Sequence, residues 1–158
     1  RTDAIATEIV NAFEQGRKVL LLTERTDHLE ALQKVLYERV TTLFVLHGRM
    51  SKKQRATLIA ELEALPADAP RVLLATGKLV GEGFDHPPLD TLVLAMPVSW
   101  TGTLQQYAGR LHRDHANKTN VRIIDYIDGG HPALLRMWEK RQRGYKAMGY
   151  QIMFEPDE

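Results

Sequence analysis

The chain lacks cysteine altogether, so it can hold neither a disulfide framework nor a catalytic thiolate, and this fits a reducing compartment. It also lacks an excess of charge: 21 Lys and Arg against 20 Asp and Glu leave a formal net charge of +1. Any contact with nucleic acid must therefore come from a local patch rather than from the field of the whole molecule. No apolar run approaches the roughly 18 residues of a membrane helix, and no signal segment opens the chain. We expect a cytoplasmic or nuclear protein that is not secreted and has no membrane partner.

The composition is that of an ordinary globular protein. Of its 158 residues, 44% are hydrophobic and 26% are charged, and a chain of this length can bury one real core. One compact domain is the expectation. The first residue is Arg1 rather than Met, so we expect a fragment of a longer polypeptide.

Short apolar runs alternate with helical patterns along the chain. Strands are predicted at Val19–Leu22, whose uniformly apolar run is typical of a strand buried on both faces, and at Thr42–Leu46, Val72–Ala75, Thr91–Ala95 and Val121–Tyr126. Helices are predicted around Ile5–Phe13, from Asp27, from the capping box of Ser51 and Gln54, over Thr103–His112, and from Pro132. This alternation favours a single three-layer α/β/α domain with a mainly parallel sheet. Ligands of such sheets bind beyond the carboxyl ends of the strands, and the loops to examine are residues 23–26, 47–50, 76–88 and 97–102.

One face of the predicted helix over Thr103–His112 has an unusual composition. Gln106, Gly109, Arg110 and Arg113 lie at helical spacing, opposite an apolar stripe. The glycine allows a partner to approach the backbone, and the two guanidinium groups can converge on phosphate oxygens. The alternative is a solvated surface in which Arg110 pairs with Asp114.

A glycine-rich segment, Thr76–Asp85, follows the predicted strand Val72–Ala75. Three glycines within seven residues indicate positive φ angles or close contact with a ligand, and Asp85 could accept a hydrogen bond from a ribose hydroxyl. A crossover loop whose aspartate bonds to its own backbone is the alternative.

Several other patterns give weaker support, or none, for a binding or catalytic site. Gly77-Lys78 is not a P-loop, because Val72 replaces its first glycine and Leu79 its Ser or Thr. Without cysteines or an H-E-x-x-H pair, we expect no metal site. Asp125 has the position of a strand-end acid, but no phosphate-binding segment precedes it. The last predicted helix packs through Leu134, Trp138 and Tyr145 and carries five basic residues on a solvated face, for which nucleic-acid binding is the less favoured interpretation.

Residues 106–113, which fit Q-x-x-G-R-x-x-R, resemble the sixth motif of superfamily 2 helicases and translocases. Three further segments resemble motifs of that family in its order. Val19–Arg25 resembles motif IV, Leu46–Met50 with Arg55 resembles motif IVa, and Ala75–Asp85 resembles motif V. The segment Leu89–Pro97 resembles the corresponding segment in one branch of the family, which holds type III restriction subunits and XPB-like and UvrB-like proteins. This resemblance implies a role in DNA restriction or DNA repair. Gln106, where DEAD-box proteins have His, and a longer motif V argue against an RNA-type DEAD-box protein.

The resemblance implies that residues 1–158 form the second RecA-like lobe of a two-lobe motor. The first lobe of such motors supplies the P-loop, the Mg²⁺ ligand and the acid that activates water, and the chain has none of these. By the family match, Arg110 and Arg113 are arginine fingers. Gly83, Asp85, Gln106 and Gly109 contact ATP, and Arg25, Gly48 and Thr76 hold the backbone of a nucleic acid, which we expect to be DNA.

The first lobe of the same polypeptide is therefore an expected partner, and the chain alone is expected to be inactive. The alternative function is a non-catalytic regulatory domain of the same architecture that binds a nucleotide or phosphate.

Overall fold

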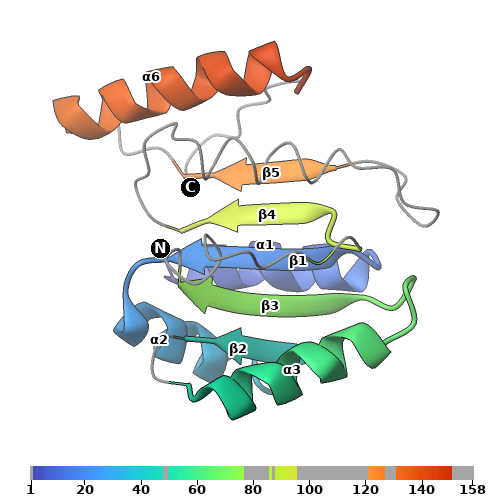
Figure 1. Ribbon diagram of the computed structural model, residues 1–158. Helices are drawn as coiled ribbons and strands as arrows, with labels where there is room; N and C mark the ends of the chain where they lie inside the picture. Colours follow the sequence, from blue (N-terminus) through green and yellow to red (C-terminus); the bar gives the residue numbers. More distant parts are fainter. Residues whose placement is uncertain are drawn as a thin grey trace.

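The computed structural model describes residues 2–47, 50–76, 86, 88–95, 121–126 and 131–150. These residues form one five-stranded sheet in the order β2-β3-β1-β4-β5, in which every pair of neighbours is parallel (Figure 1). The strands are β1 (Lys18–Thr23), β2 (Leu43–Leu46), β3 (Arg71–Thr76), β4 (Thr91–Leu94) and β5 (Arg122–Asp125). The predicted parallel α/β sheet is therefore confirmed.

Helices cover both faces of the sheet, because the inner strands are apolar on both sides. Val19 and Leu21 of β1 pack on one face with α1 (Thr2–Glu14) and α2 (Thr26–Leu36). Leu20 and Leu22 pack on the other face with α3 (Lys52–Ala64) and α6 (Pro132–Ala147). Since successive side chains of a strand point to opposite faces, one continuous apolar run supplies two cores. In Figure 1, α3 and α6 lie at opposite ends of the strand order.

The helix ends follow the chemistry expected from the sequence. The Ser51 hydroxyl accepts a hydrogen bond from Gln54 N at 3.1 Å, and the Gln54 side chain accepts one from Ser51 N at 2.9 Å, so the predicted capping box is present. Gly16 follows α1 with a φ of +82°, a conformation that glycine adopts without strain. Pro132 stands at the start of α6. The helix predicted over Thr103–His112 lies outside the described residues.

Candidate functional site

The carboxyl ends of three neighbouring strands bring the predicted nucleic-acid segments to one edge of the sheet. Thr23 and Thr76 end β1 and β3 and are register partners, and Leu46 at the end of β2 pairs with Ala75. Arg25 follows Thr23 by two residues. The loops that contain Arg25 and Thr76, and the segment that leads from His47 toward Gly48, therefore begin side by side. Parallel strands make this unavoidable, since all of them end at the same edge.

The turn between β1 and α2 is organised by the side chain of Thr23. This side chain is buried, and its hydroxyl accepts a hydrogen bond from Arg25 N at 3.4 Å. Nδ1 of His28, in the first turn of α2, lies 3.3 Å from the same oxygen. Arg25 is the N-cap residue of α2 and makes no side-chain capping bond. The buried hydroxyl thus fixes a turn that directs the Arg25 side chain outward.

The Arg25 guanidinium already holds a carboxylate. Nε and Nη2 of Arg25 donate to the two carboxylate oxygens of Asp27 at 3.2 and 2.7 Å. Both side chains are exposed, so solvent weakens the ion pair. The hydrogen bond raises the pKa of Arg25 and lowers that of Asp27. A phosphate offers the same two-oxygen geometry as this carboxylate, so the fork of Arg25 is suited to a phosphate that displaces Asp27.

The remaining predicted site residues lie outside the described part of the chain. They are Gly48, Gly83, Asp85, Gln106, Gly109, Arg110 and Arg113. Of the nine site residues predicted from the sequence, the structure places Arg25 and Thr76 at the same edge of the sheet.

Asp125, at the carboxyl end of β5, contacts α6 through a buried polar cluster. Its two carboxylate oxygens accept hydrogen bonds from Nε of Arg141 at 2.7 Å and Nη2 at 3.0 Å, and the Tyr145 hydroxyl donates a third at 3.0 Å. The Arg141 guanidinium also lies 5.7 Å from the ring centre of Trp138. Burial, and then the negative charge of Asp125, raise the pKa of Tyr145.

This cluster corrects one prediction from the sequence. The sequence places Arg141 on the solvated basic face of the last helix, yet this residue is only 2% exposed. The packing prediction is confirmed for Trp138 and Tyr145, which pack against the sheet. Leu135, rather than the predicted Leu134, packs with them. Arg141 therefore attaches α6 to the strand end.

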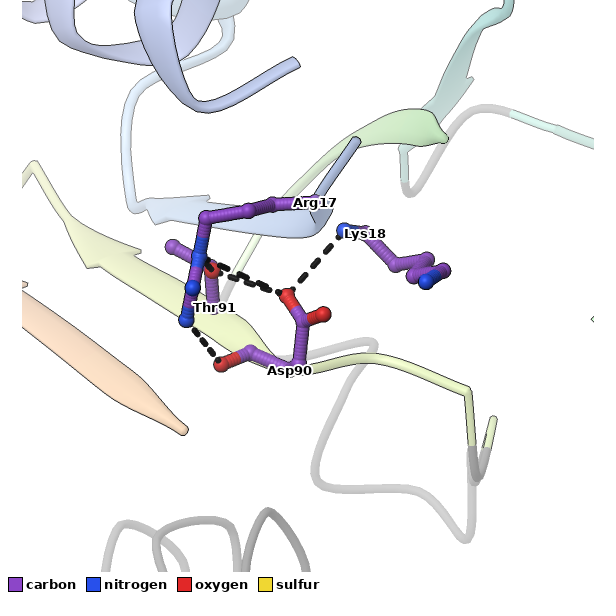
Figure 2. Close-up of polar contacts among 4 residues, drawn as sticks. All are labelled: Arg17, Lys18, Asp90 and Thr91. Atoms are coloured by element: carbon purple, nitrogen blue, oxygen red, sulfur yellow. Dashed lines mark hydrogen bonds and ion pairs between the residues drawn. The ribbon is translucent and has the colours of Figure 1, made fainter. Parts of the chain in front are cut away.

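A second buried polar cluster lies at the opposite edge of the sheet, where the strands begin (Figure 2). We call this the amino edge. Nε of Arg17 donates to the Thr91 hydroxyl at 2.6 Å, and Nη2 donates to the backbone oxygen of Asp90 at 3.3 Å. The Asp90 carboxylate accepts hydrogen bonds from Lys18 N and from the Thr91 hydroxyl. Burial lowers the pKa of Arg17, while the charge of Asp90 opposes this change. These contacts join the beginnings of β1 and β4.

Arg71, which begins β3, supports the same edge. It is fully buried and donates to the backbone oxygens of Leu62, Pro66 and Ala69, at and just after the end of α3. Its Nη1 lies 2.9 Å from Nε2 of His86. No pattern in the sequence points to these roles of Arg17 and Arg71. We infer that the contacts of Arg17 with Asp90 and Thr91, and those of Arg71, stabilise the fold.

Within the described ranges, no group of three or more His, Asp or Glu side chains could hold a metal ion. None of the described helices is long and apolar enough to cross a membrane.

Residues 2–115 match the family model of the helicase conserved C-terminal domain. Since the match covers well over half of the 158 residues, the chain belongs to this family.

Curated relatives of the chain differ greatly in length. An uncharacterized protein of Invertebrate iridescent virus 3 is 36% identical over 83 residues, which are 52% of this chain and 75% of the viral protein. A probable helicase of Escherichia phage T5 is 26% identical, with 84% of this chain and 30% of that protein aligned. An uncharacterized ATP-dependent helicase of Mycoplasma genitalium is 29% identical, over 75% of this chain and 11% of the relative. The chain thus spans less than a third of the two relatives named as helicases.

Among solved structures, UvsW of phage T4 is similar with a TM-score of 0.68 and 17% sequence identity, over 92% of this chain and 32% of UvsW. This similarity concerns the fold, which is RecA-like. The branch of restriction subunits and XPB-like and UvrB-like proteins stays a prediction.

Proposed function

We propose that the chain is the second motor lobe of an ATP-dependent helicase or translocase of superfamily 2. The observation that carries this proposal is the family match over residues 2–115, because that range includes Gln106–Arg113. The relative from Mycoplasma genitalium is named as an ATP-dependent helicase, which supports ATP as the nucleotide. A first lobe of the same polypeptide holds most of the triphosphate and the Mg²⁺.

In this proposal, Arg110 and Arg113 act on ATP at the interface of the two lobes. Phosphoryl transfer spreads negative charge over the oxygens of the γ-phosphate, and an inserted guanidinium stabilises that charge. Gly83, Asp85, Gln106 and Gly109 contact the nucleotide. Because the arginines reach the phosphate only when the lobes close, hydrolysis is coupled to their relative movement.

The carboxyl edge forms the nucleic-acid side of the proposal. Arg25, Thr76 and the segment at Gly48 offer donors for a phosphodiester backbone, and the register pairing of Thr23 with Thr76 supports a shared contact surface. Arg25 exchanges the Asp27 carboxylate for a backbone phosphate. Contacts of this kind position a strand but do not read its bases, so we expect little sequence preference. DNA is the expected nucleic acid.

The isolated chain should bind single-stranded DNA weakly and lose it as salt rises, because phosphate contacts release counterions. Arg25→Ala combined with Thr76→Ala should reduce the affinity and flatten its salt dependence. Fluorescence anisotropy of a labelled oligonucleotide, measured over a range of KCl concentrations, gives both quantities. Lys34→Ala, at an exposed position on α2, is the control. Affinity that is independent of salt, or unchanged in the double variant, would contradict this placement.

The isolated chain should show no ATPase activity, because the groups that bind the triphosphate and Mg²⁺ belong to the first lobe. Phosphate release is measured with and without single-stranded DNA, against a buffer blank. Turnover that persists in Arg110→Ala would count against a motor fragment.

The alternative is a non-catalytic regulatory domain that binds a nucleotide or phosphate. One observation favours it, since the aligned segment makes up 75% of the iridescent virus protein, leaving that relative little room for a first lobe. The open reading frame around the chain separates the two functions: a P-loop and an acidic motif upstream identify the motor.

A further inference from the structure

The outer side of α6 carries four exposed basic side chains. Arg136, Lys140, Arg143 and Lys146 are exposed, and they follow one another at spacings of four, three and three residues. At such spacings they share one side of the helix. Trp138, Arg141 and Tyr145 are buried. The four exposed cations are called the basic stripe below.

Little among the described residues neutralises the basic stripe. In the part of the chain that the structure describes, no hydrogen bond or ion pair involves its four side chains. Glu139 is the one acidic residue of α6. Arg141, by contrast, is matched by Asp125 at 2.7 Å. The fold thus buries one cation of α6 with a carboxylate and leaves the other four in solvent.

The charge of the molecule is strongly segregated. The 16 residues of α6 include five basic and one acidic residue, a net charge of +4. The whole chain has a net charge of +1, so its other 142 residues together carry −3. The near-neutral composition therefore hides one strongly basic helix on a remainder that is only slightly acidic, and such a helix attracts polyanions.

The stripe also has dimensions that suit a polyanion. Its ends are ten residues apart, which corresponds to about 15 Å of helix. One strand of B-DNA advances by about 3.4 Å per phosphate, so four cations span about four phosphates.

The basic stripe lies near Arg25 and Thr76, the residues predicted to hold the nucleic-acid backbone, on the same sheet. α6 lies beside β5, the edge strand (Figure 1), and begins seven residues after β5 ends. Arg141 and Tyr145, in the second half of α6, bond to Asp125 at the carboxyl end of β5, on the edge of the sheet that also carries Arg25 and Thr76. In the strand order, β5 is two places from β1, which is about 10 Å.

We propose that the basic stripe of α6 binds the phosphate backbone of a nucleic acid and extends the contact surface of the carboxyl-edge loops. The proposal rests on the proposed function for the class of its ligand, since an acidic protein would also carry negative charge. It adds a site outside the helicase motifs, at residues beyond the segment 2–115 that matches the family model.

The test compares two double charge reversals in the 158-residue chain. Lys140→Glu with Arg143→Glu alters the stripe. Lys34→Glu with Arg39→Glu alters two exposed cations in α2 and the turn after it, on the other face of the sheet, and changes the net charge equally. Binding of a labelled single-stranded oligonucleotide is followed by anisotropy at several salt concentrations. Since all four positions are exposed, both variants should unfold at the wild-type temperature.

We expect the stripe variant to bind about tenfold more weakly at low salt, and the slope of log K against log salt to fall by about 1.4, as for two lost contacts to a single strand. The control should stay within about twofold of wild type. Equal weakening of both variants would overturn the proposal, because net charge alone would then explain it. Wild-type affinity of the stripe variant would also overturn it. So would poly-glutamate, an acidic polypeptide, if it displaced the labelled oligonucleotide as well as unlabelled oligonucleotide does.

The same assay separates this inference from the proposed function. If Arg25→Ala with Thr76→Ala weakens binding and the stripe variant keeps wild-type affinity, the stripe proposal fails and the proposed contact of Arg25 and Thr76 with the strand stands. If the stripe variant alone loses binding, the stripe is supported and the placement of the grip fails. A wild-type chain that binds no oligonucleotide at low salt overturns both.

Discussion

In the two-lobe enzyme, Arg110→Ala and Arg113→Ala are each expected to lower kcat by about 10³- to 10⁵-fold, the range for loss of an arginine finger. ATP affinity should change much less, because the first lobe makes most of the contacts to the bound triphosphate. The fingers act mainly on charge that develops in the transition state. Steady-state phosphate release gives kcat, and fluorescent-nucleotide titration gives the Kd for ATP.

Two comparisons make this result specific to the guanidinium groups. Arg→Lys at either position should restore little activity, because an ammonium group cannot reproduce the planar fork. Arg39→Ala, at an exposed position after α2, should leave kcat unchanged. Each variant should melt at the wild-type temperature. Wild-type turnover in Arg113→Ala would mean that the helix face formed by Gln106, Gly109, Arg110 and Arg113 is a solvated surface. A large loss of stability in either variant would instead give these arginines a structural role.

The largest loss of stability is expected from Asp125→Ala, which leaves the Arg141 guanidinium buried without its carboxylate. Breaking a buried ion pair from one side costs about 3 to 5 kcal/mol. For a chain of this size that corresponds to a fall in Tm of roughly 10 °C. Differential scanning calorimetry of the variant and the wild type measures this change.

The exposed pair of Arg25 and Asp27 provides the matched control. It has the same two-oxygen geometry as the pair of Arg141 and Asp125 but lies in solvent, so Asp27→Ala should leave Tm unchanged. Arg141→Met combined with Asp125→Leu should recover part of the loss, because no buried charge then lacks its partner. Equal Tm values for Asp125→Ala and Asp27→Ala would show that burial of the α6 cluster adds nothing to stability.

The fold was largely predictable because its signals are local. The run Val19–Leu22 has no polar residue, which identifies a strand buried on both faces, and Ser51 with Gln54 specifies a helix start within four residues. The predicted strands at Thr91–Ala95 and Val121–Tyr126 are confirmed with ends that differ by one residue. Sheet order follows from long-range packing and could not be taken from these patterns.

The buried polar clusters leave little signal in the sequence, because their members come from distant parts of the chain. Arg17 and Asp90 are 73 residues apart, and only the pairing of β1 with β4 brings them together. Arg141 did leave a signal, since it lies three residues after Trp138 and four before Tyr145, on the packed side of the helix. Arginine is rarely fully buried without a partner, and the partner, Asp125, belongs to another element.

The two ends of the sheet differ in how freely evolution can alter them. At the amino edge, Arg17, Asp90 and Arg71 connect strand beginnings to one another and to the end of α3, so a change there disturbs several elements at once. At the carboxyl edge, Asp125 is bonded to α6, but Arg25 and Asp27, in the turn between β1 and α2, bond to each other in solvent, so their replacement should leave the core intact. Selection can therefore change the charge of this turn, and with it the partner, while the strands stay as they are.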